Sequence, residues 1–148
     1  MAATKSAGAE ARLHLLSANR DAISLMLDRA VAGGLAPSDS VVLVADQRDT
    51  VGRELAVAAA EQAGLDGDSE AARVQTRGEI PTAIIVVPLA AARMLFAQSH
   101  PEVARGLVRR PAPGLVRVIV VAEGAAMLAH AQVSPHVGRL GAVTDRSS

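Results

Sequence analysis

The chain has 148 residues, half of them hydrophobic, with 15 basic and 15 acidic side chains, no cysteine, and Phe96 as its one residue of the Phe, Tyr and Trp group. This length fits a single domain with its own core, and the lack of cysteine excludes disulfides, thiolate metal sites and a cysteine nucleophile. With one aromatic ring and no net charge, we expect no nucleic-acid partner.

The balanced charge hides an asymmetry between the two parts of the chain. Residues 1–87 carry 8 basic and 12 acidic groups, a net charge of −4, whereas residues 88–148 carry 7 and 3, a net charge of +4. No acid lies between Glu102 and Glu123, and that stretch contains Arg105, Arg109, Arg110 and Arg117. It is either a solvated helix face and loop, or an anion site or one side of a head-to-tail contact.

The N-terminus and the apolar runs of the chain bear on its cellular location. No apolar run at the N-terminus fits a signal peptide, and none reaches the roughly 20 residues of a membrane helix. We therefore expect a cytoplasmic protein without membrane association. Residues 1–148 are expected to form one α/β domain, with residues 1–8 and 144–148 as flexible tails.

The first predicted element is helical. From residue 9 to about residue 32 the apolar residues recur at helical spacing, and Gly33, Gly34 and Pro37 supply the stop that such a helix needs. Ser17 and Asn19 interrupt the pattern. One helix and two shorter helices both remain open.

Three β-branched runs, at residues 41–44, 83–87 and 116–121, then predict buried strands. Helices are expected after them at residues 51–63, 90–108 with a break at Pro101, and 124–132. Continuous apolar strands need cover on both faces. We therefore predict a three-layer α/β sandwich with a mostly parallel sheet of four to five strands, Rossmann-like or flavodoxin-like, preceded by an N-terminal helix.

Two segments are less defined. Residues 65–80 are too few for a strand and a full helix, so either an edge strand or a crossover helix is missing there. A short strand near residues 74–76 and a helix both remain open. Residues 137–143 are expected to add a final edge strand.

The loop after the first strand is the first candidate site, because ligands of open parallel sheets bind beyond the carboxyl ends of the strands. It holds Asp46, Arg48, Asp49, Thr50 and Gly52. Backbone N–H groups at the following helix start, with Thr50 and Gly52, would hold a phosphate or carboxylate, while Asp46 would bind a hydroxyl or a metal. The structural alternative is that Asp49 or Thr50 caps the helix.

Glu123 follows the third strand and would share a crevice with Asp46 if their strands were neighbours. Otherwise it complements the dipole of the next helix. The chain has no glycine-rich nucleotide loop, no histidine pair at metal-ligand spacing and no G-x-S-x-G turn. The four histidines are therefore expected at the surface or partly packed. No metal or cofactor is predicted, and whether the chain is an enzyme stays open.

The runs at residues 41–46, 83–87, 116–123 and 141–145 resemble the strands of a two-component receiver domain. The comparison puts Asp46 at the acidic pair of that family, Val87 near its phosphoacceptor, Ala122 at its hydroxyl position and Asp145 near its lysine. Because Asp46 alone keeps the family's chemistry, the resemblance implies a degenerate receiver that is not phosphorylated in the usual way and acts through contacts. The loop holding Asp46 also resembles that of phosphoribosyltransferases.

These features favour a non-catalytic regulatory or protein-interaction module with a receiver-like fold, acting through homo- or hetero-oligomeric contacts, with a homodimer expected. Its first candidate interface is the N-terminal helix, where Leu15, Leu25 and Met26 lie off the main apolar stripe. The alternative is a small enzyme or ligand-binding protein that holds a phosphate- or carboxylate-bearing molecule around Asp46 and Glu123.

Overall fold

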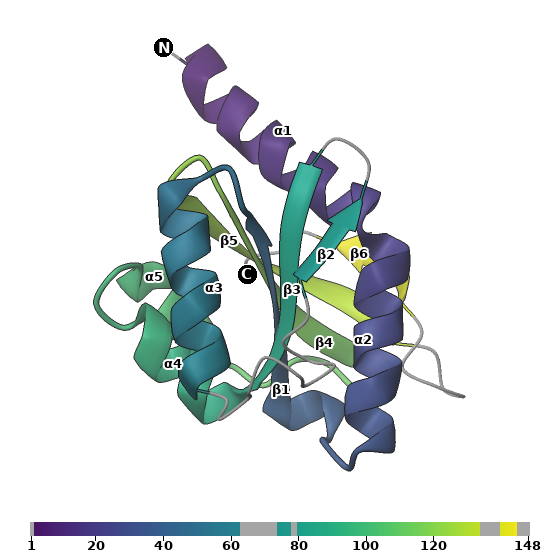
Figure 1. Ribbon diagram of the computed structural model, residues 1–148. Coiled ribbons are helices and arrows are strands. Elements are labelled where there is room, and N and C mark those ends of the chain that lie inside the picture. Colours follow the sequence, from purple (N-terminus) through teal and green to yellow (C-terminus); the bar gives the residue numbers. More distant parts are fainter. Residues whose placement is uncertain (1, 63–73, 78–79, 134–139, 145–148) are drawn as a thin grey trace.

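The computed structural model describes the backbone of residues 2–62, 74–77, 80–133 and 140–144, and the side chains of residues 8–62 and 82–131 (Figure 1). The described helices are α1 (Ala2–Ala18), α2 (Arg20–Ala32), the short 3-10 helix η1 (Pro37–Asp39), α3 (Thr50–Gln62), α4 (Leu89–Phe96) and α5 (Pro101–Gly106). The described strands are β1 (Ser40–Asp46), β2 (Val74–Arg77), β3 (Ile80–Pro88), β4 (Leu115–Ala122), β5 (Ala125–Val133) and β6 (Leu140–Thr144).

The described strands form one sheet in the order β2-β3-β1-β4-β5-β6. β1 and β4 are parallel, with Val41 opposite Arg117 and Ala45 opposite Val121. The other neighbouring pairs of described strands are antiparallel. The chain is an α/β protein as predicted, but the expectation of a mostly parallel, flavodoxin-like sheet is wrong.

Hairpins explain this difference. β4 and β5 are joined by Glu123 and Gly124, whose φ angles are 54° and 76°, and Ala122 pairs with Ala125 across the turn. Two central residues with positive φ are typical of the tight turn that matches the twist of an antiparallel pair. A parallel neighbour would need a crossover of a dozen or more residues. The helix predicted for residues 124–132 is therefore wrong, since this segment forms β5.

The side chains of β5 alternate between the two faces of the sheet. Ala129 and Ala131 are buried in one core cluster and Met127 packs against it, whereas Ala126 and Leu128 pack against the other cluster. An alanine-rich segment has a high intrinsic helix propensity. Here pairing along the whole length of β4 overrides that preference.

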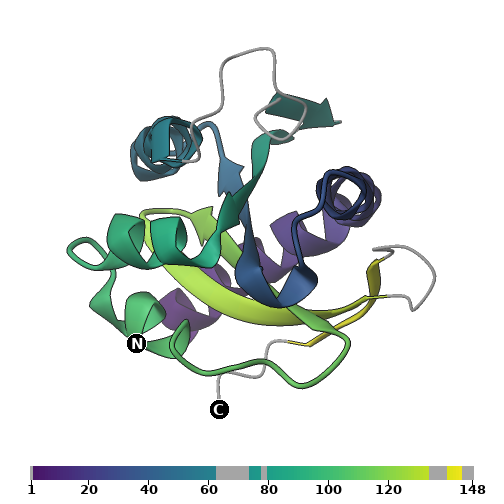
Figure 2. The ribbon, with the colours of Figure 1, turned by 90° about the horizontal axis from the view of Figure 1, so that it is seen from below.

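Helices cover both faces of the sheet, which makes three layers (Figure 2). Val42 and Val44 of β1 pack with α1 and α2 in one core cluster, while Val41, Leu43 and Ala45 pack with α3, α4 and α5 in the other. Because successive strand residues point to opposite faces, a strand covered on both sides has to be apolar throughout. The buried run in β1 meets this requirement.

Asn19 divides the long N-terminal helical segment into α1 and α2. Its side chain is fully buried, and its Nδ2 donates hydrogen bonds to the backbone oxygen of Leu15 at 2.8 Å and to Oγ1 of Thr82 at 3.4 Å. No side-chain hydrogen bond from Asn19 caps α2. Asn19 therefore links the helix junction to the start of β3. The backbone of α1 already begins at Ala2, within the segment expected to be a tail.

The remaining elements lie close to their predicted positions. α3 corresponds to the helix at residues 51–63, and β2 covers the short strand at residues 74–76. β6 overlaps the expected edge strand at residues 140–143 and includes Thr144, which was expected in the C-terminal tail. Pro101 is the first residue of α5, a position where the missing N–H of proline costs no helical hydrogen bond. Residues 65–73, 137–139 and 145–148 lie outside the described part of the chain.

Arg117 is buried in β4, so the basic stretch is not uniformly a solvated face. Its side chain is 2% exposed, and its Nη1 and Nη2 donate hydrogen bonds to the backbone oxygens of Ser38 at 2.8 Å and Arg109 at 3.0 Å. Burial lowers the pKa of the Arg117 guanidinium, while the charge of Asp39 opposes this shift and that of Arg110 adds to it. The guanidinium thus joins the segments before β1 and before β4.

We expect Arg117→Ala to lower the free energy of unfolding by about 1–3 kcal/mol, because two backbone oxygens lose their buried donor. Urea unfolding followed by circular dichroism measures this loss. Arg109→Ala is the matched control, since the Arg109 side chain is exposed and only its backbone accepts the bond. Equal stability losses in the two variants would contradict the role given to the buried guanidinium.

Candidate functional site

The parallel pairing of β1 with β4 brings two predicted site residues to the same edge of the sheet. Asp46 ends β1, and Glu123 directly follows β4. Thr82, at the start of β3, pairs with Asp46 at this edge. β1 and β4 are neighbours, so Asp46 and Glu123 share this edge.

The carboxylate of Asp46 is bound by Arg48. Oδ1 of Asp46 accepts hydrogen bonds from the backbone N–H of Arg48 at 2.9 Å and from its Nε at 3.2 Å, and Oδ2 accepts one from Nη2 at 3.1 Å. Burial by itself raises the pKa of Asp46, but the hydrogen bonds from Arg48 and its positive charge outweigh burial and leave that pKa below its usual value. Asp46 is thus an ionised group that is already neutralised within the chain.

Asp49 connects the loop after β1 to the β4–β5 turn. Its Oδ2 accepts a hydrogen bond from the backbone N–H of Gly124 at 2.8 Å. Glu123 precedes Gly124 in the turn and is exposed. Glu123 therefore lies in a hairpin turn, and the expectation that it complements the dipole of a following helix is wrong.

Thr50 and Gly52 lie in the first turn of α3, as predicted. Oγ1 of Thr50 accepts a hydrogen bond from Nη2 of Arg53 at 3.4 Å. A Cβ atom at Gly52 would overlap the backbone oxygen of Asp46. Glycine is thus required for α3 to lie this close to the end of β1.

A cleft of about 480 Å³ lies beside this edge, between α3 and the segment that follows α4. His100 contributes to it, with Nδ1 at 2.9 Å from Oγ of Ser99 and Nε2 at 3.5 Å from the backbone oxygen of Gly124. The His100 ring also meets Phe96 edge-on, with ring centroids 5.8 Å apart. Sequence reasoning expected His100 to be surface-exposed or partly packed. The sequence feature that indicates a fixed position for His100 is the proline that follows it, because Pro101 begins α5.

The charge of this cleft does not match the anionic ligand expected from the sequence. Glu54 is the one residue with a formal charge among those lining it. The full lining set is Val51, Glu54, Leu55, Ala58, Leu95, Gln98, Ser99, His100 and Gly124. A carboxylate without a basic partner in the lining disfavours a phosphate or carboxylate ligand there.

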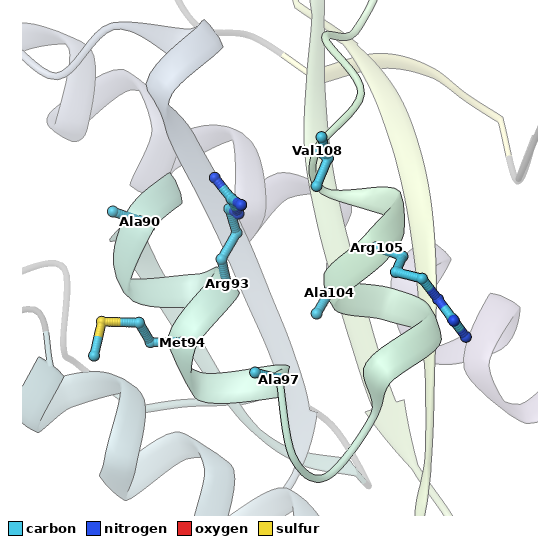
Figure 3. A pocket seen from close by; sticks show the side chains of 7 residues that line it. All are labelled: Ala90, Arg93, Met94, Ala97, Ala104, Arg105 and Val108. Atoms are coloured by element: carbon cyan, nitrogen blue, oxygen red, sulfur yellow. The ribbon is translucent and has the colours of Figure 1, made fainter.

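A second depression, of about 510 Å³, is a groove between α4 and α5 (Figure 3). Ala97, directly after α4, and Ala104 of α5 flank it, and Met94 and Val108, which also line it, are largely exposed, at 68% and 64%. The complete lining is Ala90, Arg93, Met94, Ala97, Ala104, Arg105 and Val108. Both charged groups that line this groove are therefore arginines, and neither forms an ion pair with a described residue. From here on it is called the α4–α5 groove.

The interface predicted on the N-terminal helix is mostly core. Leu15 and Met26 are each 1% exposed and pack against the sheet, while Leu25 is 46% exposed. Leu15 and Met26 lie off the apolar stripe of a single continuous helix, but α1 and α2 are separate helices with different orientations (Figure 1). One helical wheel therefore does not describe both of them. This interface prediction is wrong for Leu15 and Met26.

The positions compared with a receiver domain fall at two different edges of the sheet. Ala122 ends β4 near Asp46, at the edge just described. Val87 pairs with Val41 at the opposite end of β1, because β3 is antiparallel to β1. Asp145 lies outside the described residues. The alignment of Val87 with a phosphoacceptor beside Asp46 therefore has no counterpart in this sheet.

Comparisons of the chain with protein-family models, with curated proteins and with solved structures gave no match. No helix in the described part of the chain is long and apolar enough to span a membrane. Within the same residues, no group of three or more histidine and acidic side chains is placed to hold a metal ion.

We expect Gly52→Ala to destabilise the fold by about 1–3 kcal/mol, because the added methyl group forces α3 away from the end of β1. Thermal and urea unfolding measure the effect. Gly8→Ala is the control, since the nearest atom to its new Cβ is Nη1 of Arg12 at 3.4 Å and alanine favours a helix. A Gly52→Ala variant as stable as the wild type would rule out the close contact.

A second prediction concerns acid. The pKa of folded Asp46 lies below its usual 3.8, so its ionised form favours the folded state. This contribution is complete above about pH 4 and is lost as the pH falls through the folded pKa. The stability gap between wild type and Asp46→Asn should therefore be constant from about pH 5 to 7 and shrink below about pH 4.

Urea unfolding at a series of pH values measures this gap. Glu10→Gln, which removes an exposed carboxylate from α1, is the control for a general change in charge. A gap that stays unchanged down to about pH 3 would disprove the stabilising pairing of Asp46 with Arg48.

Proposed function

We propose that this protein is a non-catalytic interaction module and that the α4–α5 groove binds an acidic amphipathic segment of a protein partner. The groove combines an apolar floor with arginines, which is the chemistry that accepts an amphipathic helix with acidic flanks. The distribution of exposed apolar side chains carries the proposal.

Three of the five large hydrophobic side chains exposed in the described part of the chain lie on one helical layer. The five are Leu13, Leu25, Val57, Met94 and Val108. The three most exposed of them, Val57 at 60%, Met94 at 68% and Val108 at 64%, belong to α3, to α4 and to the segment directly after α5. Met94 and Val108 both line the α4–α5 groove, and an exposed apolar patch of this kind marks a surface that another molecule covers.

Methionine and arginine are enriched at protein interfaces, and methionine adapts its shape to different partners. Met94 and Arg93 lie next to each other on α4, and Arg105 lies across the groove on α5. The basic stretch of the sequence continues with Arg109 and Arg110, both exposed. The lining of the groove contains no acidic residue, so it would not repel an acidic segment.

The contacts at the strand ends favour this function over binding of a small anion. Arg48 already neutralises Asp46, and Asp49 is bonded to Gly124. Gly52 is packed against the backbone of Asp46. Asp46, Asp49 and Thr50 thus already have partners within the chain. The small-ligand alternative around Asp46 and Glu123 stays a prediction.

Fluorescence anisotropy with two synthetic helical peptides tests the proposal. One peptide carries leucine on one face and glutamate on the other, and the second replaces each glutamate by lysine. We expect the acidic peptide to bind, and Met94→Asp and the double change Arg93→Glu with Arg105→Glu to weaken its binding by about tenfold or more.

Leu25→Asp is the matched control, because Leu25 is an exposed apolar residue on the opposite helical layer. It should leave binding of the acidic peptide unchanged. Equal binding of the acidic and basic peptides, or binding that survives both groove variants, would refute the proposed function.

A further inference from the structure

We infer that the segment bound in the α4–α5 groove is helix α3 of a second copy of this chain, in a dimer with two-fold symmetry. This inference rests on the proposed function, since it names the partner of the same groove. It follows from the exposed face of α3, from the opposite charges of this face and of the α4–α5 groove, and from the position of both on the same helical layer.

The exposed face of α3 has the chemistry that the groove requires. Val57 is 60% exposed on α3, and Glu54 and Glu61 are exposed three residues before it and four residues after it. Residues at these spacings lie on one side of a helix. The chain therefore carries its own helical segment with an exposed apolar residue between two acids.

The other charges on these surfaces leave this complementarity in place. Arg53 also lies on α3, but its Nη1 and Nη2 donate hydrogen bonds to the backbone oxygen of Gln47 at 3.1 Å and to Oγ1 of Thr50 at 3.4 Å. Its guanidinium is thus held at the loop before α3. Glu102 is exposed at the start of α5 but does not line the groove.

The arrangement of the three helices permits a reciprocal contact. α3, α4 and α5 lie side by side on one face of the sheet, with α4 in the middle (Figure 2). A two-fold axis passing near α4 sets α3 of each copy against the α4–α5 groove of the other. The same contact then forms twice and the assembly closes as a dimer, as an isologous interface requires. Met94 of α4 lies near the axis.

Sedimentation velocity with charge-reversed variants tests this dimer. One variant carries Glu54→Lys and Glu61→Lys, and the other carries Arg93→Glu and Arg105→Glu; all four side chains are exposed. We expect the wild type to be a dimer. Each variant alone should associate with itself at least about tenfold more weakly than the wild type does. Mixing the two variants should restore a dimer, because each interface of the mixed pair again joins opposite charges.

Thermal melts confirm that each variant is folded before it is compared. A wild type that sediments as a monomer at about 100 µM, or variants that dimerise alone as well as the wild type does, would overturn the inference. A monomeric chain that still binds the acidic peptide would leave the proposed function in place and identify another protein as its partner.

Cross-linking gives an independent measurement that does not rely on charge. The chain has no cysteine, so Met94→Cys places a single thiol near the expected axis. Mild oxidation should convert most of this variant into a disulfide-linked dimer, whereas Leu25→Cys, on the opposite layer, should remain largely unlinked. Equal cross-linking of the two variants would argue against the two-fold contact.

Discussion

The parallel pairing of β1 with β4 sets the position of the other elements. Residues 41–45 of β1 are fully buried, and their side chains enter both core clusters. Burying a valine, leucine or isoleucine side chain contributes about 1.5–3 kcal/mol, so a strand of this kind is stable only when both of its faces are covered. α1 and α2 cover one face, and α3, α4 and α5 cover the other. β3 then joins β1, and β5 joins β4, in antiparallel pairs, which keeps the two parallel strands at the centre.

This pairing also determines the chemistry at the ends of the strands. It brings the loop after β1 beside the turn after β4, at the edge where α/β proteins commonly bind ligands. In this chain the polar groups there bind one another. Arg48 neutralises Asp46, Asp49 holds the backbone of Gly124, and Gly52 lets α3 close against Asp46. These contacts stabilise the edge. Among the described residues, the most exposed large apolar side chains lie instead on the helical layer of α3, α4 and α5.

The charge asymmetry of the chain acquires a spatial meaning on that layer. The acidic first part of the sequence contributes α3, and the basic last part contributes α4 and α5, which lie beside it. A surface with acid at one side, arginine at the other and exposed apolar side chains on both is self-complementary under two-fold rotation. The proposed dimer therefore depends on the order of the helices along one face of the sheet.

The sequence by itself determined the α/β class, the buried strands β1, β3 and β4, helix α3 and the break at Pro101, because β-branched runs, helical spacing and proline act locally. It also placed Asp46 and Glu123 just after two strands, but left open whether these strands are neighbours. Only the tertiary structure decided the strand directions, since Glu123 and Gly124 form a tight turn where local propensity favours a helix. The partners of Arg48 and Asp49, and the burial of Leu15, Met26 and Arg117, likewise depend on which segments meet in space. A local pattern shows which residues are apolar. Which face of a helix or strand is buried and which is exposed depends on packing between segments that are distant in the sequence.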